Sequence, residues 1–269
     1  MKSVDGRVWT DVLSTVLQGV RSGDANRLFS LGVGDGVWLA FGSWEKKYYS
    51  IRGGIFNVSK FPGVFQVLCL AYGNRLWIAC DPYQTKDQIS ASGVLYSQDG
   101  GNTFVRSSSG MAGLRDAVYA QRRGFWVGVR GDNGTSEMSG VSNDGITWDT
   151  RGSNAHLMLE NIFAVVFSDR LNLFLATGKR LQGSRSSVVI SSPDGLTWSP
   201  MGLFADIDIA GGNDLAVAEL ANGTVVIVVA GDAGTFRRSQ IMVSYDEGRT
   251  WIGKVSRNYF FVHYFYNDN

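Results

Sequence analysis

The chain has 269 residues and a mass of 29.3 kDa, with 44% hydrophobic and 18% charged residues. This composition supplies ample material for a core and excludes a disordered chain. Lysine and arginine total 25 against 24 aspartate and glutamate residues, so the formal net charge is +1. A general electrostatic attraction to nucleic acid or to an acidic membrane surface is therefore not expected.

The amino-terminal residues 1–11 contain two basic and two acidic residues and no apolar run, which is unlike a secretory signal peptide. No stretch reaches the ~18 consecutive apolar residues typical of a membrane helix. We therefore expect no membrane insertion and no nucleic-acid partner. We expect the protein to lie in a virus particle if it is viral, and in the cytoplasm otherwise.

Short apolar runs follow one another along the chain, and most come in pairs separated by two or three turn residues. In chain order the predicted strands are 27–33 with 37–42, 64–72 with 75–80, 116–121 with 125–130, 161–168 with 171–177 and 187–191, 214–220 with 224–231, and finally 258–266. The second strands carry large apolar residues at corresponding places, which indicates a core between repeated units; these residues are Trp38, Trp77, Trp126, Phe174 and Ile227.

The two cysteines, Cys69 and Cys80, lie in two neighbouring runs that are joined by Gly73 and Asn74. A turn at those two residues would place the cysteines on one face of a hairpin but diagonally. We therefore interpret them as two buried thiols.

A repeated turn motif occurs between the strands. Residues 97–104, 142–148, 192–198 and 244–251 share a Ser, an Asp two positions later, a Gly, a Thr and a final Trp or Phe. Residues 3–9 lack only the Thr, and residues 50–56 have Arg in place of the Asp. The six marker positions are separated by 47, 47, 45, 50 and 52 residues, which is the regular spacing of a repeat protein.

The motif resembles the Asp box, or BNR repeat, of sialidase-like β-propellers. The Asp carboxylate can accept backbone N–H groups across a tight turn, and the aromatic residue begins the outgoing strand. The resemblance implies structural roles for Asp5, Asp99, Asp144, Asp194 and Asp246, and for Trp9, Phe104, Trp148, Trp198 and Trp251.

The resemblance implies an all-β fold, a β-propeller of four-stranded antiparallel blades in a single domain, residues 1–269. Five complete blades are favoured. The alternative is six positions, with the sixth blade assembled from both termini. Residues 1–26 are then an amino-terminal strand and connection, and residues 257–269 contain an aromatic closing or interface strand that is apolar on both faces.

Catalytic motifs of the sialidase family are not carried over, because the chain has no Arg-Ile-Pro sequence. We assign no catalytic residue, although Asp116 and Asp214 at the starts of innermost strands are candidates for an acid and base pair. His156 and His263 have no companion ligands at metal-binding spacing, so we expect no metal and no cofactor.

The ligand face of a propeller is formed by the loops between second and third strands and by the connections between blades. Exposed aromatic residues and cations in these loops are suited to stacking on sugars and to binding anionic groups. The candidates are Trp44, Lys46, Tyr83, Lys179, Arg180, Arg185, Phe236, Arg237 and Arg238.

These observations predict a non-catalytic binding or assembly module, with a surface glycan, a protein partner or further copies of the chain as its partners. The sequence shows no secretory signal peptide. A bacteriophage tail, fibre or spike component fits this observation best, because virions assemble in the cytoplasm and leave the cell by lysis. A glycan-cleaving enzyme and a cytoplasmic protein-binding scaffold are the alternatives.

Overall fold

The computed structural model describes residues 28–42, 47–52, 55–60, 67–81, 93–131, 137–181, 187–202, 209–233 and 239–255. Asp5, Trp9 and the two terminal segments, 1–26 and 257–269, lie outside these residues. The regular secondary structure of the described residues is nearly all strand, with one short 3-10 helix, η2 (Ala155–Leu157). None of the helices within them is long and apolar enough to cross a membrane.

Within the described residues, the strands form five successive antiparallel units, which we call blades 1 to 5. Blades 1 and 2 are β1 (Leu28–Gly34), β2 (Val37–Gly42), β3 (Lys47–Arg52) and β4 (Ile55–Lys60), then β5 (Cys69–Gly73), β6 (Leu76–Cys80), β7 (Val94–Ser97) and β8 (Val105–Arg106). Blade 3 is β9 (Leu114–Ala120), β10 (Phe125–Arg130) and β11 (Ser139–Ser142). Blades 4 and 5 are β12 (Leu159–Ser168), β13 (Leu173–Arg180), β14 (Val189–Ser192) and β15 (Ser199–Pro200), then β16 (Ile209–Glu219), β17 (Val225–Ala233), β18 (Ser239–Ser244) and β19 (Ile252–Val255).

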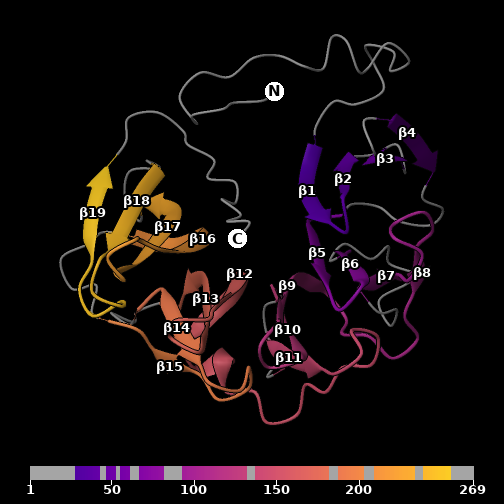
Figure 1. Ribbon diagram of the computed structural model, residues 1–269. Coiled ribbons are helices and arrows are strands. Elements are labelled where there is room, and N and C mark those ends of the chain that lie inside the picture. The colour runs from indigo at the N-terminus through magenta and orange to yellow at the C-terminus, as the bar shows by residue number, and fades with distance from the viewer. Residues whose placement is uncertain are drawn as a thin grey trace.

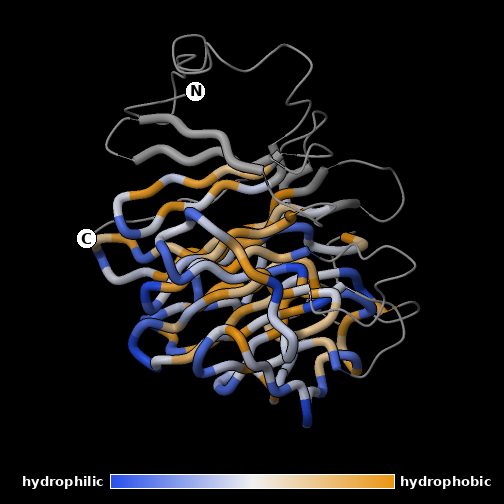
Figure 2. Tube along the Cα trace, turned by 90° about the vertical axis from the view of Figure 1, so that its right-hand side faces the viewer, coloured by the Kyte–Doolittle hydropathy of each residue, from blue (hydrophilic) through white to orange (hydrophobic). Residues whose placement is uncertain are grey.

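The blades lie side by side in an arc around a common centre, with β1, β5, β9, β12 and β16 innermost (Figure 1). In blade 3 an isolated pairing between Val141 and Asp149 stands at the place of the fourth strand. Hydrophobic stretches follow the stacked strands, and hydrophilic ones gather at the turns (Figure 2). The chain is therefore an all-β propeller of antiparallel blades, as the sequence predicts.

Contacts between blades are built by the large residues at corresponding places in the second strands. Trp77, Trp126, Phe174 and Ile227 are fully buried. For example, Trp77 packs so closely on β1 that a Cβ atom added to Gly32 would lie 2.9 Å from the Trp77 ring. Trp38, the corresponding residue in blade 1, differs because 50% of its surface is exposed.

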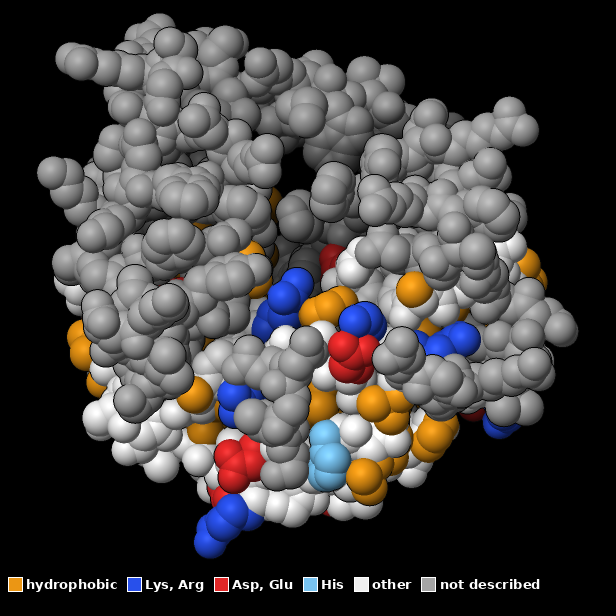
Figure 3. All heavy atoms as spheres, turned by 180° about the vertical axis from the view of Figure 1, so that it is seen from behind, with side chains coloured by type: hydrophobic (Ala, Val, Ile, Leu, Met, Phe, Trp, Pro, Cys, Tyr) orange, Lys and Arg blue, Asp and Glu red, His pale blue; other side chains and the backbone are white. Residues whose placement is uncertain are grey.

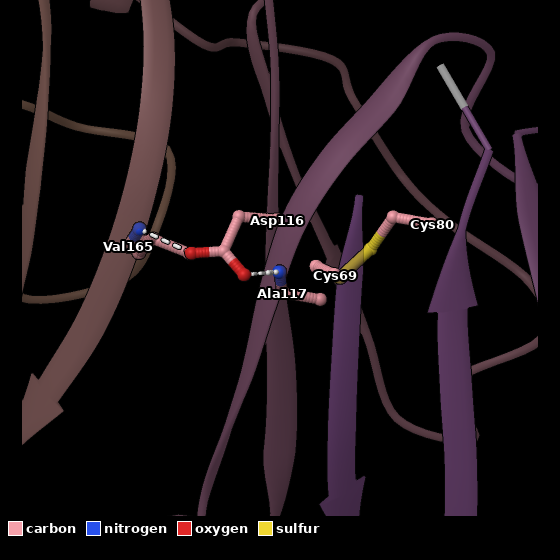
Figure 4. Close-up of a disulfide and its surroundings, with 5 residues drawn as sticks. All are labelled: Cys69, Cys80, Asp116, Ala117 and Val165. Carbon is pink, nitrogen blue, oxygen red and sulfur yellow. Dashed lines mark hydrogen bonds between the residues drawn. A yellow bond between two sulfur atoms is a disulfide. The ribbon is translucent and has the colours of Figure 1, made fainter. Parts of the chain in front are cut away.

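The interpretation of the cysteines as two buried thiols is wrong: Cys69 and Cys80 form a disulfide between β5 and β6 (Figure 4). The turn lies one residue further along than expected, at Asn74 and Arg75, both of which have positive φ. Gly73 therefore pairs with Leu76, and the same register places Cys69 directly opposite Cys80 rather than diagonally. Directly opposed cysteines with Cα atoms 5.0 Å apart meet the distance that a disulfide requires.

Blades 4 and 5 approach each other closely at the beginning of their innermost strands. Here Lys179 of β13, which pairs with Asn161 on β12, also pairs with Gly211 on β16. The approach requires glycine, because a Cβ atom at Gly211 would lie 3.0 Å from the Gly178 carbonyl oxygen. β12 contains two register shifts beside this close approach, at 159–161 and at 162–164.

Candidate functional site

The innermost strands begin, and the second strands end, on the same face of the molecule, since neighbouring strands are antiparallel. We call this face, around the centre of the arc, the channel mouth. It includes the first residues of β9, β12 and β16 and the last residues of β10 and β13. Basic, acidic and hydrophobic side chains gather near the middle of the face seen in Figure 3.

An arginine stacked on an aromatic ring links two blades at the channel mouth. The guanidinium carbon of Arg115, on β9, lies 4.2 Å from the centre of the Phe163 ring, on β12. Gly131 leaves room for this side chain, because a Cβ atom there would lie 3.0 Å from Arg115 Cδ. Such a cation–π contact is worth about 0.5–2 kcal/mol and fixes the orientation of the guanidinium plane. The mouth therefore carries a positioned cation beside an aromatic side chain.

Three further cationic residues end the second strands. Arg130, the last residue of β10, is 9% exposed. Lys179 and Arg180 end β13, and Lys179 Nζ lies 2.7 Å from Glu160 Oε1 on β12. Both members of that pair are partly exposed, so it contributes only about 0–1 kcal/mol to stability and can exchange for a ligand.

Asp116 holds two neighbouring blades together. One carboxylate oxygen accepts the N–H of Ala117 at 2.9 Å, and the other accepts the N–H of Val165, in blade 4, at 2.8 Å (Figure 4). The residue is 7% exposed. Its two oxygens are therefore committed to backbone donors, which is a structural role.

Asp214 occupies the corresponding place in blade 5. Asp116 lies three residues before Tyr119, the partner of Trp126. In the same way, Asp214 lies three residues before Val217, the partner of Ile227. Its Oδ1 accepts the Leu215 N–H at 2.8 Å. Burial raises the pKa of Asp214 to about 6, and the Leu215 N–H offsets part of that rise.

The turns of the repeated motif lie on the opposite face. In blade 2, Asp99 Oδ1 accepts the backbone N–H groups of Asn102 and Thr103 at 3.0 and 2.9 Å, and Oδ2 accepts the Thr103 hydroxyl at 2.6 Å. The Ser97 hydroxyl donates to the same carboxylate at 2.7 Å. Burial acts to raise the pKa of Asp99, but these hydrogen bonds outweigh it and hold the pKa at about 2.

Corresponding turns in blades 3, 4 and 5 are built the same way, around Asp144, Asp194 and Asp246. In each of them the indole N–H of the final tryptophan donates to the carbonyl of the turn glycine; these tryptophans are Trp148, Trp198 and Trp251. Phe104, in the corresponding place of blade 2, contacts Phe41 of blade 1 with ring centres 5.6 Å apart.

A shallow pocket of about 570 Å³ lies beside the turn of blade 3. Its charged groups already bind one another: Asp144 is engaged in the turn, and Asp149 accepts two hydrogen bonds from the Arg151 guanidinium. The channel mouth, where side chains of different blades converge, is therefore the better candidate site.

Of the ligand-binding residues predicted from the sequence, Lys179 and Arg180 are described, and both lie at the mouth, in a strand rather than in the expected loop. The others lie outside the described residues: Trp44, Lys46, Tyr83, Arg185, Phe236, Arg237 and Arg238. Sequence reasoning missed Arg115, Phe163 and Glu160. The one available signal was a charged residue, Arg115, directly before Asp116 in an innermost strand.

No protein family model matches the chain, and no curated protein matches it. Solved structures are similar in fold. A GH74 enzyme from Niastella koreensis gives a TM-score of 0.56 at 14% identity, over 84% of this chain and 31% of that one. The GH74 xyloglucanase from Xanthomonas campestris gives 0.56 at 12% identity, over 84% and 38%.

A catalytically inactive virginiamycin B lyase from Staphylococcus aureus, solved with quinupristin, gives a TM-score of 0.58 at 8% identity, over 86% of this chain and 70% of that one. The chain thus spans about a third of the length of the GH74 enzymes. Identities this low support the propeller fold alone.

Proposed function

We propose that the chain is a non-catalytic binding module that recognises an acidic glycan at the channel mouth. The observation that carries the proposal is the stack of Arg115 on Phe163, at a distance of 4.2 Å. A positioned guanidinium binds a carboxylate or sulfate group through paired hydrogen bonds, and an aromatic side chain next to it offers an apolar surface to a sugar ring. Lys179 and Arg180 add cations on the neighbouring strand.

The hydrogen bonds of Asp116, one of the two candidate carboxyl groups for an acid and base pair, favour binding over hydrolysis. Most glycosidases use two carboxyl groups, one of which transfers a proton to or from the substrate. Asp116 is buried and both of its oxygens accept backbone N–H groups. Asp214 is therefore left without this partner for a two-carboxylate mechanism.

Two of the similar structures are GH74 enzymes, and one of these is a xyloglucanase. A glycan ligand for this chain is consistent with those names, although similarity in fold does not identify a substrate. A glycan-cleaving enzyme remains the second candidate.

For the setting, we propose a virus particle, in which the chain contacts a host glycan or a neighbouring virion protein. The Cys69–Cys80 disulfide supports exposure to an oxidising environment, because disulfides persist outside the cell and on virion surfaces. Mass spectrometry of purified particles from a phage that encodes the chain should detect it. Particles that lack it would exclude this setting.

The ligand proposal is tested by presenting the full chain with acidic and neutral bacterial surface polysaccharides, at about 0.1 M and at about 1 M salt. Binding to the acidic polysaccharides should weaken in high salt, since the Debye length falls from about 10 Å to about 3 Å. Phe163→Ala should reduce binding, and no reducing ends should appear. Binding of neutral polysaccharides only, or release of reducing ends above the blank, would contradict the proposal.

A further inference from the structure

The two ends of the arc present blade faces that the described residues leave uncovered. In blade 1, Leu31 and Trp38 are 55% and 50% exposed. Leu31, Val33, Trp38 and Ala40 share one face of the β1–β2 pair, because Leu31 pairs with Ala40 and Val33 pairs with Trp38. In blades 2 to 5 the residue that corresponds to Trp38 is fully buried by the preceding blade.

Blade 5 shows the same departure on its opposite face. Val228 corresponds to Leu39, Ile78, Val127 and Leu175, all of which are fully buried by the following blade. Val228 is only partly buried. Figure 1 places blades 1 and 5 at the two ends of the arc, with no described strand between them. One apolar element inserted there would cover both faces, and would complete the wall of the channel mouth.

Asp214 gives a second, independent indication of a strand at this place. Asp116 joins blade 3 to blade 4 by accepting the Val165 N–H from the next innermost strand. Asp214 has the corresponding place in blade 5. Among the described residues, Leu215 of its own strand donates to Oδ1, and no donor from a following blade reaches the carboxylate. A following innermost strand would supply that donor.

We propose that the carboxyl-terminal segment of this chain, residues 258–268, binds between blades 5 and 1 as an innermost strand and donates a backbone N–H to Asp214. The segment follows β19, the outer strand of blade 5, and every other outer strand of the described blades leads into the innermost strand of the next blade. Its alternating side chains are largely apolar on both faces, as a strand between two apolar faces requires.

The length of the segment fits this position. The corresponding residue of each innermost strand follows the last residue of the preceding turn at a similar spacing. The spacing is 13 residues from Phe104 to Ala117, 17 from Trp148 to Val165 and 17 from Trp198 to Leu215. The same spacing after Trp251 gives residues 264–268, which lie within the chain. The donor to Asp214 is therefore expected among these residues.

Hydrogen exchange of the full chain, followed by mass spectrometry, tests the proposal on the peptide 258–269. In the unaltered protein its amides should exchange at least ~100-fold more slowly than those of an unstructured peptide. Asp214→Ala should reduce this protection by ~10-fold or more. Trp38→Glu, at the other end of the arc, should do the same, because a carboxylate would be buried under the strand.

Glu219→Gln is the matched control, since Glu219 is an exposed carboxylate on the same strand, β16, and should leave the protection unchanged. The amides of β9 to β13 should stay protected in every variant, which separates loss of the strand from unfolding. Random-coil exchange of the segment in the unaltered protein would overturn the proposal. So would protection that depends on protein concentration together with a doubled mass in light scattering, because a second copy would then cover the faces.

Discussion

The two faces of this propeller are built on different principles. On the face of the repeated turns, Asp99, Asp144, Asp194 and Asp246 make nearly the same hydrogen bonds in four blades. At the channel mouth the corresponding positions differ from blade to blade: Cys69 forms a disulfide, Asp116 joins two blades, and Asp214 has a raised pKa. The turns thus repeat one set of hydrogen bonds in four blades, whereas at the mouth the corresponding residues have a different role in each blade.

The largest effect on stability is expected at the mouth, where β12 and β13 of blade 4 pair. Gly178→Ala would place a Cβ atom 1.9 Å from the Asn161 carbonyl oxygen, so the two strands would have to separate. We expect a loss of about 3 kcal/mol in the free energy of unfolding. Urea denaturation measures it, with Gly124→Ala as a control on a turn where a Cβ atom meets nothing within 4 Å. Equal losses of stability in both variants would show that the close contact at Gly178 costs no more than the strain of an alanine at the positive φ of Gly124.

On the opposite face, Asp194→Ala should cost less, about 1–2 kcal/mol, because several donors lose one acceptor but remain close to water. The donors are the Leu196 and Thr197 N–H groups and the hydroxyls of Ser192 and Thr197. Asp169→Ala, which removes an exposed carboxylate from another turn, should change the stability by less than about 0.5 kcal/mol. A loss in Asp194→Ala no larger than in this control would remove the structural role of the turn aspartates.

The pH dependence should separate the two kinds of aspartate. The pKa of Asp99 is held at about 2, below its ordinary value of 3.8, so its contribution to stability is present above about pH 4 and is lost as the pH falls toward 2. The contribution of Asp214 to stability depends on pH in the opposite direction. Its pKa is raised to about 6, so its contribution is present below about pH 4 and is lost as the pH rises through 6.

Urea midpoints measured from pH 2 to pH 7 check these signs. Asp99→Asn should flatten the acid limb below pH 4, and Asp214→Asn should flatten the region between about pH 4 and 6. Identical changes in both variants would show that the two faces do not differ in this respect.

The smallest effect on stability is expected for the ion pair at the mouth. Glu160→Gln should change the free energy of unfolding by less than about 1 kcal/mol, because the pair with Lys179 is partly exposed. It should strengthen binding of an acidic glycan by about 2- to 5-fold, since Lys179 loses a competing carboxylate. Titration calorimetry measures the change, and weaker binding in Glu160→Gln would show that Glu160 itself holds the ligand.

The sequence was informative where the structure repeats. The spacing of the turn motif and the paired apolar runs predicted the antiparallel blades, because alternation and tight turns are local properties of the chain. The cysteine pairing was missed through an error of one residue in the turn, which moves the partner of Cys69 by two positions.

The mouth was harder to predict, because it depends on contacts between blades. Arg115 and Phe163 lie 48 residues apart in the chain, and Phe163 stands at a register shift of β12, between Ile162 and Ala164. Nothing in the local sequence marks where such shifts occur. The commitment of Asp116 to the Val165 N–H likewise depends on the packing of two strands, so a composition-based list of carboxylates cannot separate it from Asp214.

The central claim, that binding takes place at the channel mouth, is tested most directly by comparing two arginines. Arg115 lies at the mouth over Phe163, whereas Arg122 lies in the turn between β9 and β10 on the opposite face, beside Asp169. Titration calorimetry with an acidic polysaccharide should show at least ~10-fold weaker binding for Arg115→Ala and unchanged binding for Arg122→Ala. Equal affinities in the two variants, or a larger loss in Arg122→Ala, would contradict the assignment of the mouth as the binding site.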